Sequence, residues 1–247
     1  MPVVYSPQMR RRSFKTLIHD NDPRCLPAYR VVEAARYLNI PTSTLRSWVS
    51  GQQYQTQRGP QFFQPVIAPG AKKPPLLSFL NLVEAHVLDA IRREHGIPLP
   101  KIRIALDYVS RRFPSEHPLA TQEFASDGLN LFIEKYGQLI NISQAGQLAM
   151  REILEAYLQR IERDLLGLPC RLYPFTRKGT PHEPRAVVID PYVSFGRPVL
   201  TGTGVPTAVI ADRYKAGECI ESLADDYGRD RLEIEDAIRS ELQVEAA

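Results

Sequence analysis

The sequence of 247 residues contains few cysteines and no long apolar run. Cys25, Cys170 and Cys219 are far apart and lack the spacing of metal ligands, so we expect a reducing compartment and no disulfide framework. No apolar stretch approaches the ~18 residues that a membrane span requires, and no apolar signal segment follows the N-terminal arginines. These absences predict a cytoplasmic protein with no membrane partner.

Motifs of catalysis are absent as well. The five histidines are scattered, with no H-E-x-x-H pattern and no neighbouring cysteine ligands. The glycine-rich run 201–204 lacks the lysine of a phosphate-binding loop, and we interpret it as a turn. No nucleophile with an adjacent base can be nominated. We therefore predict a protein that is not an enzyme and that needs no metal or cofactor.

Charge is distributed unevenly along the chain. The overall formal charge is +3, but residues 1–75 carry 11 basic and 3 acidic side chains, and residues 205–247 carry 5 basic and 11 acidic ones. A basic first part suits a polyanion such as nucleic acid, and the acidic last part does not. One end facing nucleic acid and the other facing protein is the simplest interpretation, although segregated charge also serves solubility.

The stretch Tyr29–Gly51 predicts two helices joined by a tight turn. Pro41 ends the first helix, because it has no backbone N–H, and Thr42 is expected to cap the second. The second helix would bury Leu45, Trp48 and Val49 and leave these polar residues outward: Ser43, Thr44, Arg46, Ser47 and Ser50. This pattern fits a DNA-reading helix-turn-helix, and also an ordinary helical hairpin in a core.

Basic residues flank this stretch on both sides. Residues 1–28 predict an irregular arm, laid on DNA or a partner subunit or loosely packed, that carries Arg10, Arg11 and Arg12. Two extended pieces, Phe62–Ile67 and Pro75–Leu77, would form a wing with Lys72 and Lys73 at its tip and Arg58 nearby. The alternative to a DNA-contacting wing is a surface loop with solvated lysines.

Two amphipathic helices are expected next, one capped by Ser78 and one following Pro98–Pro100. A helix-turn-helix, a wing and a helix pair, in this order, resemble the DNA-binding domain of the MerR family over roughly 29–112. Thr44, Leu45, Arg46 and Trp48 match that family's second-helix motif. The resemblance implies that Ser43, Thr44 and Arg46 meet DNA and that Trp48 belongs to the core.

Residues 113–166 predict a β-hairpin followed by a long helix. Asp127-Gly128 lies between β-rich runs, which indicates two or three antiparallel strands within 113–143. Ser143 would open the longest helix, to about Leu166, with a narrow apolar seam. That seam suits a homodimer on a palindromic operator, or packing on the chain's own hairpin. It consists of Met150, Leu154, Tyr157, Ile161 and Leu165.

Residues 167–185 are interpreted as a Pro- and Gly-rich linker before a C-terminal module at 186–247. A strand at Ala186–Ile189 and three helices are expected there, at Thr207–Lys215, Ile220–Tyr227 and Arg231–Leu242. The module resembles the domain-of-unknown-function family 433 through Ile189-Asp190-Pro191, Gly196-Arg197-Pro198-Val199, Thr201-Gly202-Thr203 and Val205-Pro206. This resemblance implies an antitoxin, VapB-like, paired with a PIN-like ribonuclease toxin.

The acidic final helix would repel phosphate and suit a basic protein surface. On charge alone, the candidates for toxin binding are Asp225, Asp226, Glu233 and Asp236. The predicted fold class is mainly α with small β elements: a winged helix-turn-helix domain, a hairpin with a long dimerisation helix, and a three-helix C-terminal module.

The predicted function is that of an antitoxin that neutralises a PIN-like ribonuclease and binds operator DNA to repress its own operon. Two alternatives stay open. One is a MerR-type regulator that senses a small molecule in the hairpin and long-helix region. The other is a protein-interaction scaffold that does not bind DNA.

Overall fold

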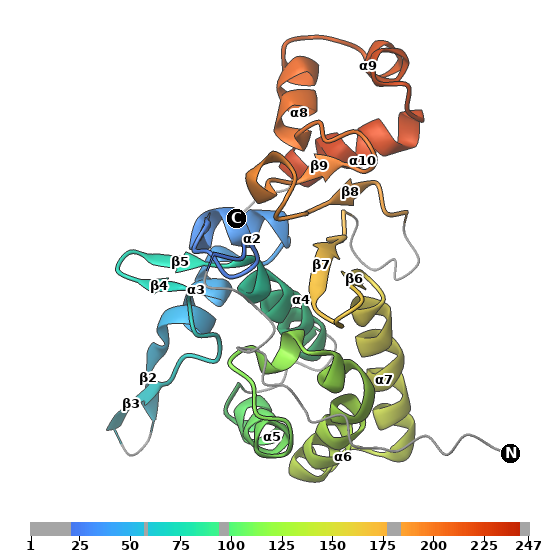
Figure 1. Ribbon diagram of the computed structural model, residues 1–247. Coiled ribbons are helices and arrows are strands. Elements are labelled where there is room, and N and C mark those ends of the chain that lie inside the picture. The colour runs from blue at the N-terminus through green and yellow to red at the C-terminus, as the bar shows by residue number, and fades with distance from the viewer. Residues whose placement is uncertain (1–20, 57–58, 94–98, 177–183, 243–247) are drawn as a thin grey trace, which may run out of the picture.

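The computed structural model describes residues 21–56, 59–93, 99–176 and 184–242, and within these ranges the chain is mainly helical with small antiparallel sheets (Figure 1). The expected helix-turn-helix is formed by α2 (Val31–Tyr37) and α3 (Thr42–Ser50). Trp48 is fully buried, as predicted, and Leu45 and Val49 are buried beside it. Thr42 is the first helical residue rather than the cap, a position that Pro41 takes.

Two β-hairpins follow, where the sequence predicted one. Strands β2 (Gln52–Thr56) and β3 (Gly59–Phe63) pair directly after α3, and β4 (Ala71–Lys72) pairs with β5 (Pro75–Leu77). Strand β1 (Tyr29–Arg30) completes the second sheet. The expected strand Phe62–Ile67 is wrong beyond Phe63, and β2 was missed because its polar sequence has no apolar alternation.

Helix α4 (Phe79–Arg93) lies at the centre of the molecule in Figure 1. The next helix along the chain is α5 (Leu99–Arg112). Ser78 caps α4 as predicted, because its Oγ accepts a hydrogen bond of 3.2 Å from the Asn81 N–H. The helix has no solvent-exposed face between Phe79 and Ile91, because every residue in this range is buried. Its polar residues therefore need partners inside the protein.

The predicted hairpin at 113–143 is wrong. This region contains a short π-helical turn, Phe124–Gly128, and then α6 (Leu129–Ile140). Gly128 has a φ of −65°, so no β-turn with positive φ forms. Phe132 and Tyr136 are buried and stack with ring centroids 5.5 Å apart, and this helical spacing of large apolar residues overrides the local Asp-Gly signal.

The predicted seam does not form one helical stripe. Ser143 caps α7 as expected, because its Oγ accepts a hydrogen bond of 3.2 Å from the Gly146 N–H. However, α7 (Gln144–Leu158) ends well before Leu166. Met150 and Leu154 are buried in this chain's own core, and Tyr157 packs against it. Ile161 is in strand β6 (Ile161–Arg163), and Leu165 is fully exposed in the turn that follows. The alternative of packing on the chain's own hairpin is wrong as stated, because that hairpin does not form, but Met150 and Leu154 do pack within the chain.

The segment interpreted as a linker contains strand β7 (Pro169–Leu172), which pairs with β6. Leu172 also exchanges backbone hydrogen bonds of 3.0 and 2.8 Å with Ile189. Ile189 lies just beyond β8 (Val187–Val188), which pairs with β9 (Val199–Leu200). The C-terminal module is thus joined to the central helices by hydrogen-bonded strands.

The last three helices match their predicted bounds: α8 (Thr207–Lys215), α9 (Ile220–Tyr227) and α10 (Arg231–Leu242). They enclose a small apolar core of their own with β8 and β9. This module lies above α2 in Figure 1, and α10 contacts that helix. The acidic C-terminal module is therefore in direct contact with the helix-turn-helix.

Candidate nucleic-acid interface

Helix α3 has one buried side and one exposed side. Leu45, Trp48 and Val49 are buried, whereas Ser43, Arg46 and Ser50 are exposed and Thr44 is half-buried. The exposed side offers hydroxyls and one guanidinium, which are groups that bind base edges and phosphates. This is the side that the sequence predicted for DNA.

Ser47 does not belong to that side. It is 7% exposed, and its Oγ donates a hydrogen bond of 2.7 Å to the Thr44 carbonyl oxygen. A serine in a helix commonly bonds to the preceding turn in this way. The prediction that Ser47 contacts DNA is wrong for this conformation, because its hydroxyl is turned into the helix.

The β4–β5 hairpin carries the predicted basic tip. Lys72 pairs with Pro75 in the register, so Lys73 lies in the turn, and both lysines are exposed. Arg58, Arg10, Arg11 and Arg12 lie outside the described residues. Of the predicted phosphate-binding side chains, the two lysines are those that the structure places.

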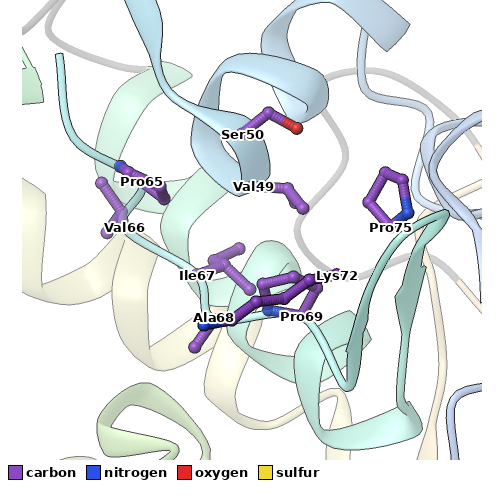
Figure 2. Close-up of a pocket in the computed structure, with 9 residues that line it drawn as sticks. All are labelled: Val49, Ser50, Pro65, Val66, Ile67, Ala68, Pro69, Lys72 and Pro75. Atoms are coloured by element: carbon purple, nitrogen blue, oxygen red, sulfur yellow. The ribbon is translucent and has the colours of Figure 1, made fainter. Parts of the chain in front are cut away.

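A pocket of about 540 Å³ lies between the end of α3 and this hairpin (Figure 2). Val49 and Ser50 of α3 line one side, and Lys72 and Pro75 of the hairpin line another. The segment 65–69 completes the lining. It is tied to α3, because the Val66 and Ile67 N–H groups donate 2.7 and 3.0 Å hydrogen bonds to the Trp48 carbonyl oxygen. Helix α3 and the β4–β5 hairpin thus line the same pocket.

The four carboxylates predicted for toxin binding are not equivalent. Asp225 and Asp226 are exposed, and Asp226 pairs with Arg213 at 2.5 Å between Oδ2 and Nη2. Glu233 accepts a hydrogen bond of 3.3 Å from the Asp230 N–H, at the start of α10. Asp236 is 1% exposed and pairs with Arg239 at 2.7 Å. The prediction for Asp236 is wrong, because its carboxylate stabilises the interior of the module.

No local pattern in the sequence indicates the most exposed aromatic side chain of this module. Phe195 is 93% exposed, and Ser194, Phe195 and Gly196 have consecutive φ values of 48°, 57° and 74°. Two non-glycine residues in the left-handed region cost roughly 1–2 kcal/mol each. The turn is held by the Ser194 hydroxyl, which donates a hydrogen bond of 2.8 Å to the Gly204 carbonyl oxygen. Strained turns of this kind concentrate at functional sites.

Tyr192 lies beside this turn and is 59% exposed. Its hydroxyl donates a hydrogen bond of 3.2 Å to Asp22, a residue just before the helix-turn-helix. Asp22 in turn pairs with Arg24 at 2.7 Å, and Arg24 pairs with Asp164 at 2.7 Å. These bonds connect the C-terminal module with the N-terminal and central parts of the chain.

The described residues contain no group of three or more His, Cys, Asp and Glu side chains that could hold a metal ion. In the same residues no helix is long and apolar enough to cross a membrane.

The fold defines the class: a helix-turn-helix domain joined to a small helical C-terminal module. Comparison with known families agrees, since one described as "Putative DNA-binding HTH domain" matches residues 27–106 and another, "Protein of unknown function (DUF433)", matches residues 187–239. The first description names a helix-turn-helix domain and does not name the MerR family.

The chain belongs to the family of the "Putative antitoxin VapB45" of Mycobacterium tuberculosis. It is 33% identical to that protein over 234 residues, which cover 86% of this chain and 93% of the relative. It is also 26% identical to the "Uncharacterized protein Rv2308" of the same organism, over 85% of this chain and 88% of that one. The crystal structure of Rv2018 from Mycobacterium tuberculosis matches 87% of this chain and 98% of its own, with 27% identity and a TM-score of 0.62.

Proposed function

We propose that this protein is an antitoxin that binds operator DNA of its own operon and neutralises a PIN-like ribonuclease toxin. The observation that carries the proposal is the exposed side of α3 beside a lysine hairpin, in a chain of the same family as the "Putative antitoxin VapB45". A DNA-facing domain and an acidic module on one chain suit the two partners.

On the DNA side, Arg46 is assigned to a base edge, with Ser43 and Thr44 next to it. Arginine forms bidentate contacts with guanine in the major groove, where a helix of this size fits. Lys72 and Lys73 are assigned to phosphates, because they are exposed at the tip of a hairpin and sequence-independent charge is what a phosphate requires. We further propose a homodimer on a palindromic operator, the usual match between protein and operator symmetry.

On the toxin side, the strained turn at Phe195 is assigned as the apolar anchor, with Tyr192 beside it. Interfaces depend on a few aromatic side chains that enter pockets of the partner. The acidic residues Asp225, Asp226 and Glu233 would meet a basic rim on the toxin. Asp236 has no part in this contact, because it is buried.

Gel-shift titrations with the protein's own promoter region test the DNA part. Arg46→Ala should lower affinity for the operator about 5- to 150-fold and leave binding to unrelated DNA unchanged. Lys73→Ala should weaken binding to every duplex and reduce the slope of log affinity against log salt by about 1. If Arg46→Ala binds the operator like the wild type, the assignment of α3 as the recognition helix is wrong.

Co-expression with a PIN-like ribonuclease encoded in the same operon tests the toxin part. The tagged antitoxin should retain the toxin through purification and suppress its RNA cleavage. A toxin that dissociates freely, in the presence of a folded antitoxin, would refute the toxin part and leave DNA binding untouched.

One observation favours the second function, a regulator that senses a small molecule, although it lies at α3 and not in the hairpin and long-helix region predicted for that site. The pocket of about 540 Å³ in Figure 2 is within the size range of ligand sites, about 300–1,000 Å³. Its walls are mainly apolar and Lys72 lies at its edge, so a small carboxylate with an apolar body is the matching class. A compound bound there would occupy the space between α3 and the basic hairpin, and it would change operator affinity without any toxin.

A further inference from the structure

The hairpin β2–β3 has a composition unlike that of the lysine hairpin. Neither strand contains an acidic or basic residue. Its exposed side chains are mainly glutamines instead, at positions Gln52, Gln53, Gln55 and Gln61, with Gln64 directly after β3. An amide is neutral and carries both a donor and an acceptor, so it gains little at a phosphate and more at a base edge.

The hairpin is fixed to the recognition helix. Gly51 is the one residue between α3 and β2, and its φ is +76°. A Cβ at this position would lie 2.4 Å from the Phe63 carbonyl oxygen and 2.5 Å from the Phe62 ring, so the hairpin returns tightly against the end of α3. Phe63 is buried beneath the guanidinium of Arg103, 5.6 Å from its ring centroid, and Arg103 also donates to the Pro65 carbonyl oxygen.

The strand register divides the glutamines between two faces. Gln53 lies opposite Phe62 and Gln55 lies opposite Pro60, so these four residues share one face. Residues two apart on a strand are about 6.8 Å apart, which equals about two base-pair steps of a DNA duplex. Gln53 and Gln55 are both exposed, so a strand that runs along the groove of a duplex would place them at alternate base pairs.

Figure 1 shows this hairpin projecting from the body of the molecule beyond the end of α3. It also shows the lysine hairpin β4–β5 on the same side, and the pocket shared by Val49, Ser50 and Lys72 places that hairpin next to α3. A duplex that lies on α3 therefore extends past two different hairpins. One offers ammonium groups, and the strands of the other offer amides.

We propose that the β2–β3 hairpin reads base edges of A·T pairs beside the segment read by α3, through Gln53 and Gln55. Glutamine forms two hydrogen bonds with adenine N6 and N7, a pairing that the other bases do not match. The lysine hairpin supplies affinity for any sequence, and the glutamine hairpin supplies preference. This inference rests on the DNA binding proposed above and adds a second specificity element to it.

The test is selection from a duplex library with a randomised centre, using the full-length protein, followed by sequencing of the bound DNA. For the wild type we expect the core read by α3 to be flanked by two A·T positions, two base pairs apart. Gln53→Ala with Gln55→Ala should lose the flanking preference, keep the core, and bind the best site about tenfold more weakly. The salt dependence of binding should stay the same.

A matched variant and a matched charge change sharpen the result. Gln53→Glu keeps the length of the side chain but only accepts hydrogen bonds, so it should change one flanking position from A·T to cytosine recognition. The double lysine variant, Lys72→Ala with Lys73→Ala, should have the opposite effects. Its slope of log affinity against log salt should be smaller, and its preference for flanking A·T pairs should be unchanged.

Two outcomes separate this inference from the function on which it rests. If the wild type binds a defined core and the glutamine variants keep the same flanks, affinity and salt slope, the hairpin is not a reader and the DNA-binding proposal stands. If the wild type selects no sequence and shows no gel shift, the inference and the DNA-binding proposal both fail. Since the two glutamines are exposed, circular dichroism should confirm that every variant is folded.

Discussion

Arg36 of α2 and Glu241 of α10 form an ion pair of 2.8 Å between Nη1 and Oε2. The Glu241 side chain is only 6% exposed, and its other carboxylate oxygen accepts a hydrogen bond of 2.6 Å from the Thr207 hydroxyl. Glu241 thus connects two helices of the acidic module, α8 and α10, with α2, which packs against α3.

Glu241→Ala should lower the free energy of unfolding by about 1–3 kcal/mol, because it removes the ion pair with Arg36 and the charge-assisted hydrogen bond from Thr207, whose hydroxyl keeps only the Pro198 carbonyl oxygen at 3.3 Å. Urea titration followed by circular dichroism measures the change. Arg231→Ala is the control: Arg231 pairs with Glu235 at 2.9 Å and with Glu221 at 2.8 Å but is 62% exposed, so its loss should stay within about 0.5 kcal/mol. Equal effects of the two variants would show that the Glu241 contact does not stabilise the fold.

His117 should make stability depend on pH. Its Nδ1 lies 3.0 Å from Glu84 on the buried helix α4. Burial acts to lower the pKa of His117, but the hydrogen bond and the charge of Glu84 outweigh it, so the pKa is raised above its ordinary value of 6.5. Because the folded state holds the proton more tightly, His117 adds to the free energy of unfolding. This contribution is fully present below pH 6.5 and is lost as the pH rises through the pKa of His117 in the folded state.

Urea titrations at a series of pH values from about 5 to 8 check this expectation. In Glu84→Gln the carboxylate is gone and burial dominates, so the pKa of His117 should fall and its contribution should change sign. His117→Gln should remove the dependence on this group in either background. A wild-type profile that His117→Gln leaves unaltered would contradict the prediction.

Gly51→Ala should destabilise the protein by more than Gly59→Ala. Both glycines have positive φ, +76° and +102°, so both substitutions introduce backbone strain. Only at Gly51 would the new Cβ meet the Phe62 ring and the Phe63 carbonyl oxygen, whereas at Gly59 nothing lies within 4 Å. Thermal unfolding should therefore separate the variants by at least about 1 kcal/mol. The same transition temperature for both would mean that the contact with β3 is not tight.

Substitutions of Phe195 should separate the stability of the protein from its binding of the proposed toxin. Phe195→Gly should raise the free energy of unfolding by up to about 1 kcal/mol, because glycine adopts positive φ without strain. Phe195→Ala keeps the strain and loses a ring that is 93% exposed, so its stability should equal that of the wild type. Both variants should retain less toxin in a pull-down. Full toxin retention by both would exclude Phe195 as the anchor.

Local signals were sufficient where one short segment decides its own structure. The helix-turn-helix follows from Pro41 and the apolar spacing around Trp48, and the last three helices follow from Pro206, Gly217 and Gly228 at their ends. Local signals failed at Asp127-Gly128, which indicates a turn in isolation but lies within helical backbone here. The burial of Phe124, Phe132 and Tyr136 outweighs the preference of two residues.

The sequence by itself determined the order of the modules, the two helices of the helix-turn-helix and the separation of basic from acidic charge, since these depend on neighbours within a few residues. Only the tertiary structure decided which side chains are available: it turned Ser47 inward, buried Asp236 against Arg239, placed Met150 in the chain's own core, and exposed Phe195 on a strained turn. Pairing and burial depend on residues that are distant in sequence, as with β7 and Ile189, and no local pattern contains that information.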